Sequence, residues 1–209
     1  MTVYVASILT RASETLQDAG AVRWAQAELM RHLYDGVQAL ITARPDAYTT
    51  TASFTPVAGV RQTLPAEAVS LVEVLNNTAT NKRAVVKISQ PLLEAFNRDW
   101  MGTTPAAIAT NYMYDLRTPR TWYIYPPATG DGSVDLVYST YPAEVTSGAG
   151  TYDLSPQWQT PLLAYVLGRA YAKDAEYGGN TAMSTAYMSA FAKDLAGQAA
   201  AVAAIAPKL

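Results

Sequence analysis

The sequence predicts an α+β fold: an antiparallel helical bundle built from the N- and C-terminal helices, with an inserted, mostly antiparallel β region. Apolar residues recur at helical spacing towards both ends of the 209-residue chain, and short β-branched or aromatic runs broken by Gly, Pro and Asn fill the middle. Helices from the two ends can share one bundle, so we expect a discontinuous domain of residues 1–45 plus 155–205. Residues 46–154 would form the β-rich insertion, and residues 206–209 a C-terminal tail.

Two helices are expected before the insertion. The first keeps its apolar spacing up to Leu16, and Gly20 follows as a C-terminal stop. The second covers residues 22–43 and ends before Pro45, because proline restricts the residue before it to extended conformations. The apolar faces consist of Val5, Ile8, Leu9, Ala12 and Leu16 in the first helix, and of Ala25, Leu29, Leu33, Val37, Leu40 and Ile41 in the second.

Six strands and one short helix are expected in the insertion. Residues 92–100 form the helix, with Pro91 at its first position, where a missing N–H does no harm. We expect the last three strands to form a meander, with turns at residues 117–120 and 126–132. The expected strands are residues 48–54, 69–75, 84–89, 111–116, 121–125 and 133–140.

Two more helices are expected after the insertion. Ser155-Pro156 begins the third long helix, and the Gly-Gly-Asn sequence at residues 178–180 breaks it. From Thr181 onward the last helix carries an apolar residue at every fourth position, which is typical of a packing seam. The residues of this seam are Met183, Tyr187, Phe191 and Leu195.

The composition limits the possible partners. Only 15% of the residues are charged, whereas a monomer usually carries about 25%, so we expect part of the surface to be covered by another subunit. A net charge of −2 gives no bulk attraction for nucleic acid. The most apolar segment, residues 195–206, is far shorter than the roughly 20 residues of a membrane span, so we expect a soluble protein without a membrane partner.

The residue types give little support for catalysis. There is no cysteine, and the one histidine, His32, lies in the middle of a helix with no second histidine to complete a metal site. No Gly-rich phosphate loop precedes a helix. Four carboxylates of the β region could meet as a general acid–base pair, but turn and ion-pair roles explain them better. We therefore expect no enzyme activity, metal or cofactor; the four carboxylates are Asp99, Asp115 (beside Arg117), Asp131 and Asp135.

Aromatic residues gather in the second half of the insertion. In the strand at residues 121–125, Trp122 and Ile124 point to one face and the two tyrosines to the other, so both faces need a partner. Tyrosine and tryptophan stack on sugars, and they also fill protein–protein interfaces. Glycan binding is therefore one function that this region could serve. The aromatic residues are Tyr112, Tyr114, Trp122, Tyr123, Tyr125, Tyr138 and Tyr141.

A series of short stretches carries a family resemblance. In chain order they are Arg23-Trp24, Ala27-Glu28-Leu29, Asp35-Gly36, Ala43-Arg44-Pro45-Asp46-Ala47, Leu64-Pro65, residues 68–76, Tyr114-Asp115, Pro119, Trp122-Tyr123-Ile124-Tyr125-Pro126-Pro127, residues 167–171, residues 173–177, Tyr187 and residues 191–197. In this order they resemble the head-to-tail adaptor proteins (connectors, similar to tail tubular protein A) of tailed bacteriophages. The alanine-rich end, residues 199–206, departs from the family pattern.

This resemblance implies a structural protein of the virion neck, made in the host cytoplasm and placed between the capsid portal and the tail. It implies a homo-oligomeric ring, commonly of twelve copies, beneath the portal protein. The ring would join the portal to a tail nozzle or tail-tube protein and line the DNA exit channel. Double-stranded DNA would pass through without specific binding, and neither an enzymatic activity nor a cofactor is implied. The alternative function is a glycan-binding or accessory tail module.

Two groups of residues are candidate contact sites. Exposed loops held by a rigid sheet often carry contacts, so the two predicted turns are candidates for tail or lumen contact, with solvated turn arginines as the alternative. A slim, alanine-rich C-terminal helix could dock in a groove of the portal, with a frayed tail as the alternative. The turn residues are Arg117, Arg120, Pro126, Pro127, Gly130, Asp131 and Gly132; the portal-docking residues are Gln198, Val202, Ile205, Pro207, Lys208 and Leu209.

Overall fold

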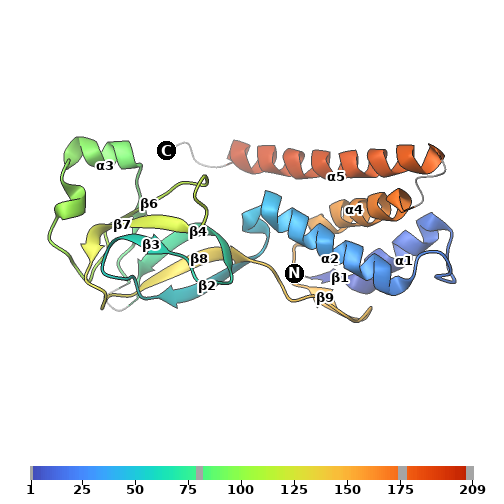
Figure 1. The fold of residues 1–209 in the computed structure, drawn as a ribbon, viewed down its shortest axis with the longest axis horizontal. Helices are drawn as coiled ribbons and strands as arrows, with labels where there is room; N and C mark the ends of the chain where they lie inside the picture. Colours follow the sequence, from blue (N-terminus) through green and yellow to red (C-terminus); the bar gives the residue numbers. More distant parts are fainter. Residues whose placement is uncertain (1, 79–81, 174–177, 206–209) are drawn as a thin grey trace. The chain divides into compact units, whose positions relative to one another are not determined.

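The chain divides into two compact units, which we call the helical unit and the β unit (Figure 1). The computed structural model describes residues 2–78, 82–173 and 178–205. The helical unit joins Met1–Ala47 to Pro142–Leu209, and the β unit is Tyr48–Tyr141. Each unit is treated by itself below.

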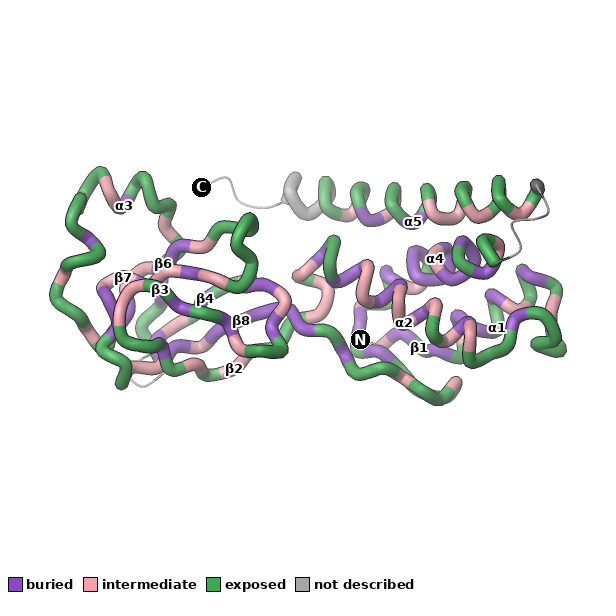
Figure 2. The backbone as a smooth tube through the Cα atoms, viewed as in Figure 1, coloured by how far each residue is buried: buried purple, intermediate pink, exposed green. Residues whose placement is uncertain are grey.

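The helical unit combines four α-helices with a two-stranded sheet. Strand β1 (Val3–Tyr4) pairs antiparallel with β9 (Thr151–Tyr152), which joins two segments far apart in the sequence. Helix α4 is the most deeply buried, and Figure 2 shows buried residues along most of its length. The helices are α1 (Val5–Leu16), α2 (Gln26–Ala43), α4 (Gln159–Ala172) and α5 (Gly178–Ile205), with short 3-10 turns at Pro45–Ala47 and Pro156–Trp158.

The connection between α1 and α2 is set by one aspartate. Helix α1 ends at Leu16 because Gln17 adopts a left-handed conformation, with φ of 56°. The Asp18 carboxylate then accepts hydrogen bonds from the backbone N–H groups of residues 22–24, each 2.9 Å long. These N–H groups are held in a turn, so α2 begins at Gln26 and not at residue 22 as the apolar spacing predicted.

Helix α4 contacts its neighbours through large aromatic side chains. The Trp24 indole N–H donates to the Ala170 carbonyl oxygen (3.0 Å), which ties the start of α2 to α4. On the other side, α5 reaches α4 through Tyr165 and Phe191, with ring centroids 5.1 Å apart, and through the stacked pair Tyr171 and Tyr187, at 5.8 Å. The seam predicted for α5 therefore exists over its central turns, whereas Met183 is 41% exposed.

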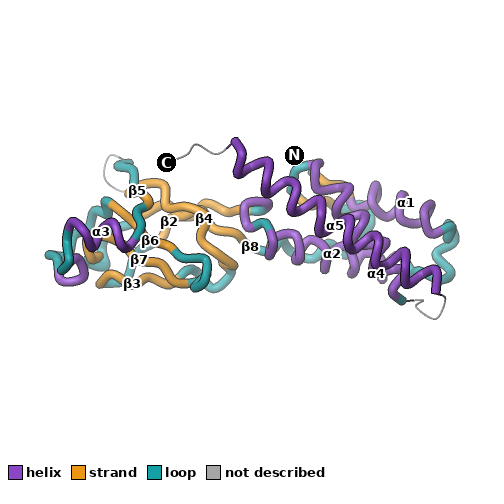
Figure 3. The backbone as a smooth tube through the Cα atoms, turned by 90° about the horizontal axis from the view of Figure 1, so that it is seen from above, coloured by secondary structure: helices purple, strands orange, loops and turns teal. Residues whose placement is uncertain are grey.

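The β unit consists of two sheets (Figure 3). One has the order β2-β8-β4 and is antiparallel throughout. The other has the order β3-β7-β6-β5 and is antiparallel except for the pairing of β5 with β6. The strands are β2 (Thr49–Phe54), β3 (Gly59–Thr63), β4 (Ala68–Asn77), β5 (Val86–Lys87), β6 (Asn111–Tyr114), β7 (Thr121–Ala128) and β8 (Val134–Thr140); α3 covers Gln90–Phe96, and a 3-10 turn covers Trp100–Gly102.

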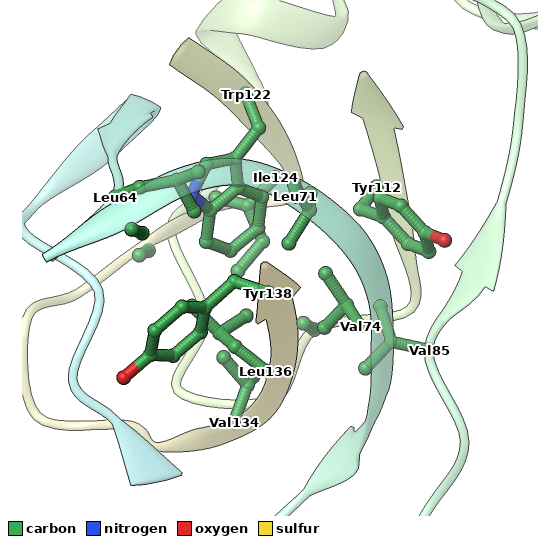
Figure 4. Close-up of a cluster of buried hydrophobic side chains, with 13 residues drawn as sticks. Leu64, Leu71, Val74, Val85, Tyr112, Trp122, Ile124, Val134, Leu136 and Tyr138 are labelled. Atoms are coloured by element: carbon green, nitrogen blue, oxygen red, sulfur yellow. The ribbon is translucent and has the colours of Figure 1, made fainter. Parts of the chain in front are cut away.

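The main core of the β unit lies between the two sheets. Trp122 and Ile124 of β7 point into it beside residues of β4 and β8 (Figure 4). Their strand neighbours Tyr123 and Tyr125 point the other way and pack on a smaller cluster formed by Leu93, Trp100 and Met113. The predicted alternation of β7 is thus confirmed: both of its faces are covered, and both covers come from the same unit.

The predicted fold class, a helical bundle with an inserted β region, is wrong. The described residues form five α-helices and nine strands in three sheets, and the protein has a strand-rich core. The prediction also placed all strands in the insertion, but β1 and β9 belong to the helical unit. Two-residue strands have no periodicity of their own, so the sequence gives no sign of them.

The predicted meander of the last three strands is also wrong. Strands β6 and β7 do pair, but β8 pairs with β2 and β4 in the other sheet. The turn after β7 therefore crosses from one sheet to the other. Residues 121–140 contain apolar positions on both strands that suit either arrangement, so only the partners from β2 and β4 decide it.

Candidate functional site

The turn between β6 and β7 carries an exposed ion pair. Asp115 accepts hydrogen bonds from the backbone N–H of Arg117 (2.9 Å) and from its Nε (2.9 Å) and Nη2 (2.5 Å). These bonds to the Arg117 guanidinium lower the pKa of Asp115 to about 2. The Arg117 side chain is 89% exposed, so the pair contributes little to stability and presents a compensated charge to the surface.

Arg120, at the end of the same turn, forms hydrogen bonds within the β unit. Its guanidinium donates to four carbonyl oxygens of the connection between β3 and β4, at distances of 2.7 to 3.4 Å. The shortest of these bonds goes to Ala68, the first residue of β4. Arg120 therefore holds a neighbouring loop in the isolated chain, a contact between residues more than fifty positions apart that no local pattern indicates.

The predicted turn at residues 126–132 is shorter than expected. Pro126 and Pro127 lie in β7, where Pro127 is buried and its carbonyl accepts a bond from the Ala106 N–H (2.8 Å). The exposed tip comprises Gly130, with φ of +100°, and Asp131, whose carboxylate accepts a hydrogen bond from Thr129. Gly132 sits so close to Ala107 that a Cβ would lie 2.1 Å from its carbonyl oxygen.

A groove of about 710 Å³ lies beside the Asp115 turn, and no sequence pattern indicated it. Its lining includes Met113 of β6 and Leu116, together with Lys87 of β5 and Glu94 of α3. Leu116 is 71% exposed. The parallel pairing of β5 with β6 places Lys87 beside Tyr112, and that pairing has no local sequence signal. A groove lined by both apolar and charged side chains suits a protein contact.

Three of the four carboxylates singled out in the sequence, and the histidine, each have a separate local partner. Asp135 accepts a bond from the Thr78 hydroxyl (2.8 Å), and Asp115 and Asp131 are held in their own turns. His32 lies on α2, with Nε2 3.9 Å from Glu28, and burial lowers its pKa. The ranges that the structure describes contain no group of three or more His, Cys, Asp or Glu residues that could hold a metal.

No helix among residues 2–78, 82–173 and 178–205 is long and apolar enough to cross a membrane.

The C-terminal candidates lie on or beyond the end of α5. Gln198 is half-buried on this helix. Val202 and Ile205 also belong to α5, but their side chains lie outside what the structure describes, as do Pro207, Lys208 and Leu209 in full. Helix α5 has 28 residues and α4 has 14, so an antiparallel α4 can cover about half of it.

The aromatic residues are not arranged as a binding platform. Tyr112, Trp122 and Tyr138 are at most 3% exposed, and they form part of the core between the sheets. The Tyr114 hydroxyl donates to the Pro119 carbonyl (3.0 Å) and accepts a bond from the Leu71 N–H (3.2 Å). Sugar stacking requires exposed ring faces, and most of these rings are committed to the interior.

Among the described residues, the exposed turn at Asp115, the groove beside it and the tip at Gly130 are surfaces that suit contact with proteins. No curated protein matches the chain in a sequence comparison. The family model described as SU10 adaptor protein matches residues 1–207, which is nearly the whole chain. The predicted resemblance is therefore confirmed, and the chain belongs to the SU10 adaptor protein family, a family of phage head-to-tail adaptors.

Proposed function

We propose that copies of this chain assemble as a ring of twelve beneath the portal, join the portal to a tail nozzle or tail-tube protein, and line the DNA exit channel of the virion neck. The family match over residues 1–207 is the observation that carries this proposal. Membership in the family makes the chain a structural component of the virion that associates with head and tail proteins. Such adaptors are typically not enzymes.

The surface of α5 supports the ring. Of its residues 179–200, only Phe191 and Leu195 are buried within the chain. The exposed residues near the end of the described stretch are small and uncharged: Ala196, Gly197, Ala199 and Ala200. Small residues allow two helices to approach closely, and a closed ring needs two different patches on each copy that fit one another. We assign the outer face of α5 to one of these patches.

The charges support passage of DNA without binding. The β unit carries seven Lys and Arg against seven Asp and Glu, and the chain as a whole has a net charge of −2. Arg117 is paired with Asp115, and Arg120 is engaged by carbonyl oxygens. Each phosphate that a free cation neutralises adds salt-sensitive affinity, so a neutral or acidic lumen favours sliding. Twelve copies at −2 each would sum to about −24.

The candidate contact residues keep their proposed roles, but some of them are exposed and others are already packed within the chain. Arg117, Gly130 and Asp131 are at exposed turns, which suits tail or lumen contact. For Arg120, Pro126, Pro127 and Gly132 such a contact would be added to existing packing. The segment at residues 198–209 remains our candidate for portal docking. The glycan-binding alternative gains nothing from the structure, because Tyr112, Trp122 and Tyr138 are buried.

Native mass spectrometry of the chain, alone and with purified portal protein, tests the proposal. We expect a ring that forms with or without the portal as a template, and we expect Ala196→Glu to prevent it, because a buried unpaired charge destabilises an interface. Ala95→Glu, the same change at an exposed position of α3 in the β unit, is the control. A chain that stays monomeric in the presence of portal and tail proteins would contradict the proposal.

Portal docking has its own experiment. The chain lacking residues 198–209 is mixed with purified portal protein and sedimented with it. We expect co-sedimentation to fall at least tenfold relative to the full chain, while the melting temperature of the β unit stays the same. Undiminished co-sedimentation of the shortened chain would remove this segment from the docking site.

A further inference from the structure

Strand β2 forms one edge of its sheet, and half of its backbone groups face away from that sheet. The register pairs Thr49 with Ser139 and continues to Phe54 with Val134 without a shift. The Thr140 N–H donates to the Tyr48 carbonyl (3.4 Å), so residues 48, 50, 52 and 54 direct their N–H and C=O groups towards β8. Residues 49, 51 and 53 direct theirs outward, and none of these six groups has a hydrogen bond within the described parts of the chain.

This edge lacks the features that normally protect a sheet edge. Thr49, Thr51 and Ser53 are all exposed, and β2 (TTTASF) contains no charged residue and no proline. Its regular register means that no bulge twists it away from an approaching strand. A long, flat, uncharged edge invites pairing with another chain, and proteins usually block it with lysine, proline or a bulge.

The other strand edges of the β unit are closed. The Leu71 N–H on β4 is bonded to the Tyr114 hydroxyl, and the Leu75 carbonyl accepts a bond from Val85, while the strand carries three register shifts. Strand β3 has a bulge and an arginine. Strand β5 is two residues long and contains a lysine. Among the described strands of this unit, β2 is therefore the one left open.

We propose that the outer edge of β2 binds an extended segment of another virion protein, which joins the sheet as a fourth strand. A second copy of this chain is disfavoured as the donor, because its other edges are closed and because pairing β2 with β2 is isologous and yields a dimer rather than a ring. Membership in an adaptor family supplies the kind of partner, a head or tail component. The inference deepens the proposed function and rests on it for the kind of partner; only the argument against β2–β2 pairing uses the ring, and nothing depends on the number of copies.

The side chains of β2 define the segment that fits. Ala52 and Phe54 point to the core between the sheets and are only half-buried, so apolar residues at alternate positions of the incoming strand would complete their cover. The residues in between would face Thr49, Thr51 and Ser53 and can be small or polar. The partner segment is thus uncharged, extended, about five residues long, and apolar at every second position.

Amide hydrogen exchange, read residue by residue, tests the inference directly. The full chain alone is compared with the neck complex purified from virions. The amides of Thr49, Thr51 and Ser53 should exchange freely in the isolated chain and at least tenfold more slowly in the complex. The amides of Thr50 and Ala52 should be protected in both, because β8 already binds them. Free exchange of the outward amides in the virion complex would overturn the inference.

A pair of substitutions at one position separates the backbone from the side chain. Thr51→Pro removes one outward N–H, which an edge strand tolerates, whereas Thr51→Val keeps it. Binding to purified portal and tail nozzle or tail-tube proteins should weaken about tenfold or more for Thr51→Pro with one of them, and stay unchanged for Thr51→Val. Thr51→Lys, which blocks the edge by charge, repeats the test if the proline variant melts early.

The outcomes distinguish this inference from the ring. If Thr51→Pro still forms the ring and binds portal and tail proteins as the unaltered chain does, the ring proposal stands and the β2 proposal fails. If the chain forms no ring but its outward amides are protected in virions, the β2 proposal stands alone. If Thr51→Pro abolishes self-association of the chain without any partner, a second copy is the occupant and the assignment to another protein is wrong.

Discussion

Replacing Gly132 with alanine tests how the turn after β7 is seated. A Cβ on this residue would lie 2.1 Å from the Ala107 carbonyl oxygen, far inside van der Waals contact. The opposing atoms belong to the backbone, so no side chain can rotate out of the way. Either the turn or the segment at residues 106–109 must move.

The structure indicates that this segment resists movement, because it is tethered on both sides of Ala107. The Ala106 N–H donates to Pro127 (2.8 Å), and Asn77 forms two bonds with the backbone of Ala109, at 2.7 and 2.8 Å. Overpacking of a fixed site costs about 1–3 kcal/mol. Loss of one tether would add about 1 kcal/mol. We therefore expect Gly132→Ala to destabilise the β unit by about 2–4 kcal/mol.

Thermal unfolding followed by near-ultraviolet circular dichroism provides the measurement, because Trp100 and Trp122, both buried in the β unit, report on its packing. A loss of about 2 kcal/mol should lower the melting temperature by roughly 4–8 °C for a chain of this size. Gly102→Ala is the matched control: its Cβ would meet nothing within 4 Å. If the two variants melt together, the close contact at Gly132 does not constrain the turn and the reasoning is wrong.

Three further predictions concern single side chains. Trp122→Ala should destabilise the β unit by about 3–5 kcal/mol in chemical denaturation, since Trp122 is 0% exposed in the core between the sheets; a smaller loss than for an exposed site such as Phe96→Ala would contradict this. Asp115 should titrate with a pKa of about 2 by NMR; because the folded-state pKa is lowered, its contribution to stability is present above pH ~4 and disappears as the pH falls towards 2, and Arg117→Gln should return the pKa towards its ordinary value. Burial lowers the pKa of His32, so the unfolded chain binds the proton more readily and stability should fall as the pH drops below about 6.5; His32→Leu should remove that part of the pH dependence, and an unchanged profile would exclude His32 as its source.

Local patterns predicted the elements well where one face of a helix or strand is apolar. The buried positions of α1 are the predicted Val5, Ile8, Leu9, Ala12 and Leu16, because period and burial share one cause: a single face contacts the core. The alternation of β7 was predicted for the same reason. The start of α2 was predicted wrongly, since the Asp18 carboxylate binds the backbone N–H groups of residues 22–24, which the prediction had placed in the first turn of the helix.

The candidate contact sites also divide into those set by neighbouring residues, which the sequence predicted, and those set by distant segments, which it did not. The pair of Asp115 and Arg117 lies within three residues, and the sequence predicted it. The four carbonyl partners of Arg120 come from residues 64–68, and the groove beside Leu116 depends on the parallel pairing of β5 with β6. Neither could be predicted, because strand pairing between distant segments is decided by which surfaces fit in three dimensions.

The amino-acid sequence by itself determined the helical faces, the two-sided character of β7 and the adaptor family. The tertiary structure decided that the strands form separate sheets and not one inserted region, that β8 leaves β7 to lie between β2 and β4, and that β2 keeps an open edge. The reason is physical: helix and strand periodicity arises from neighbours within a few residues, whereas a sheet edge is open or closed according to segments that approach from elsewhere in the chain.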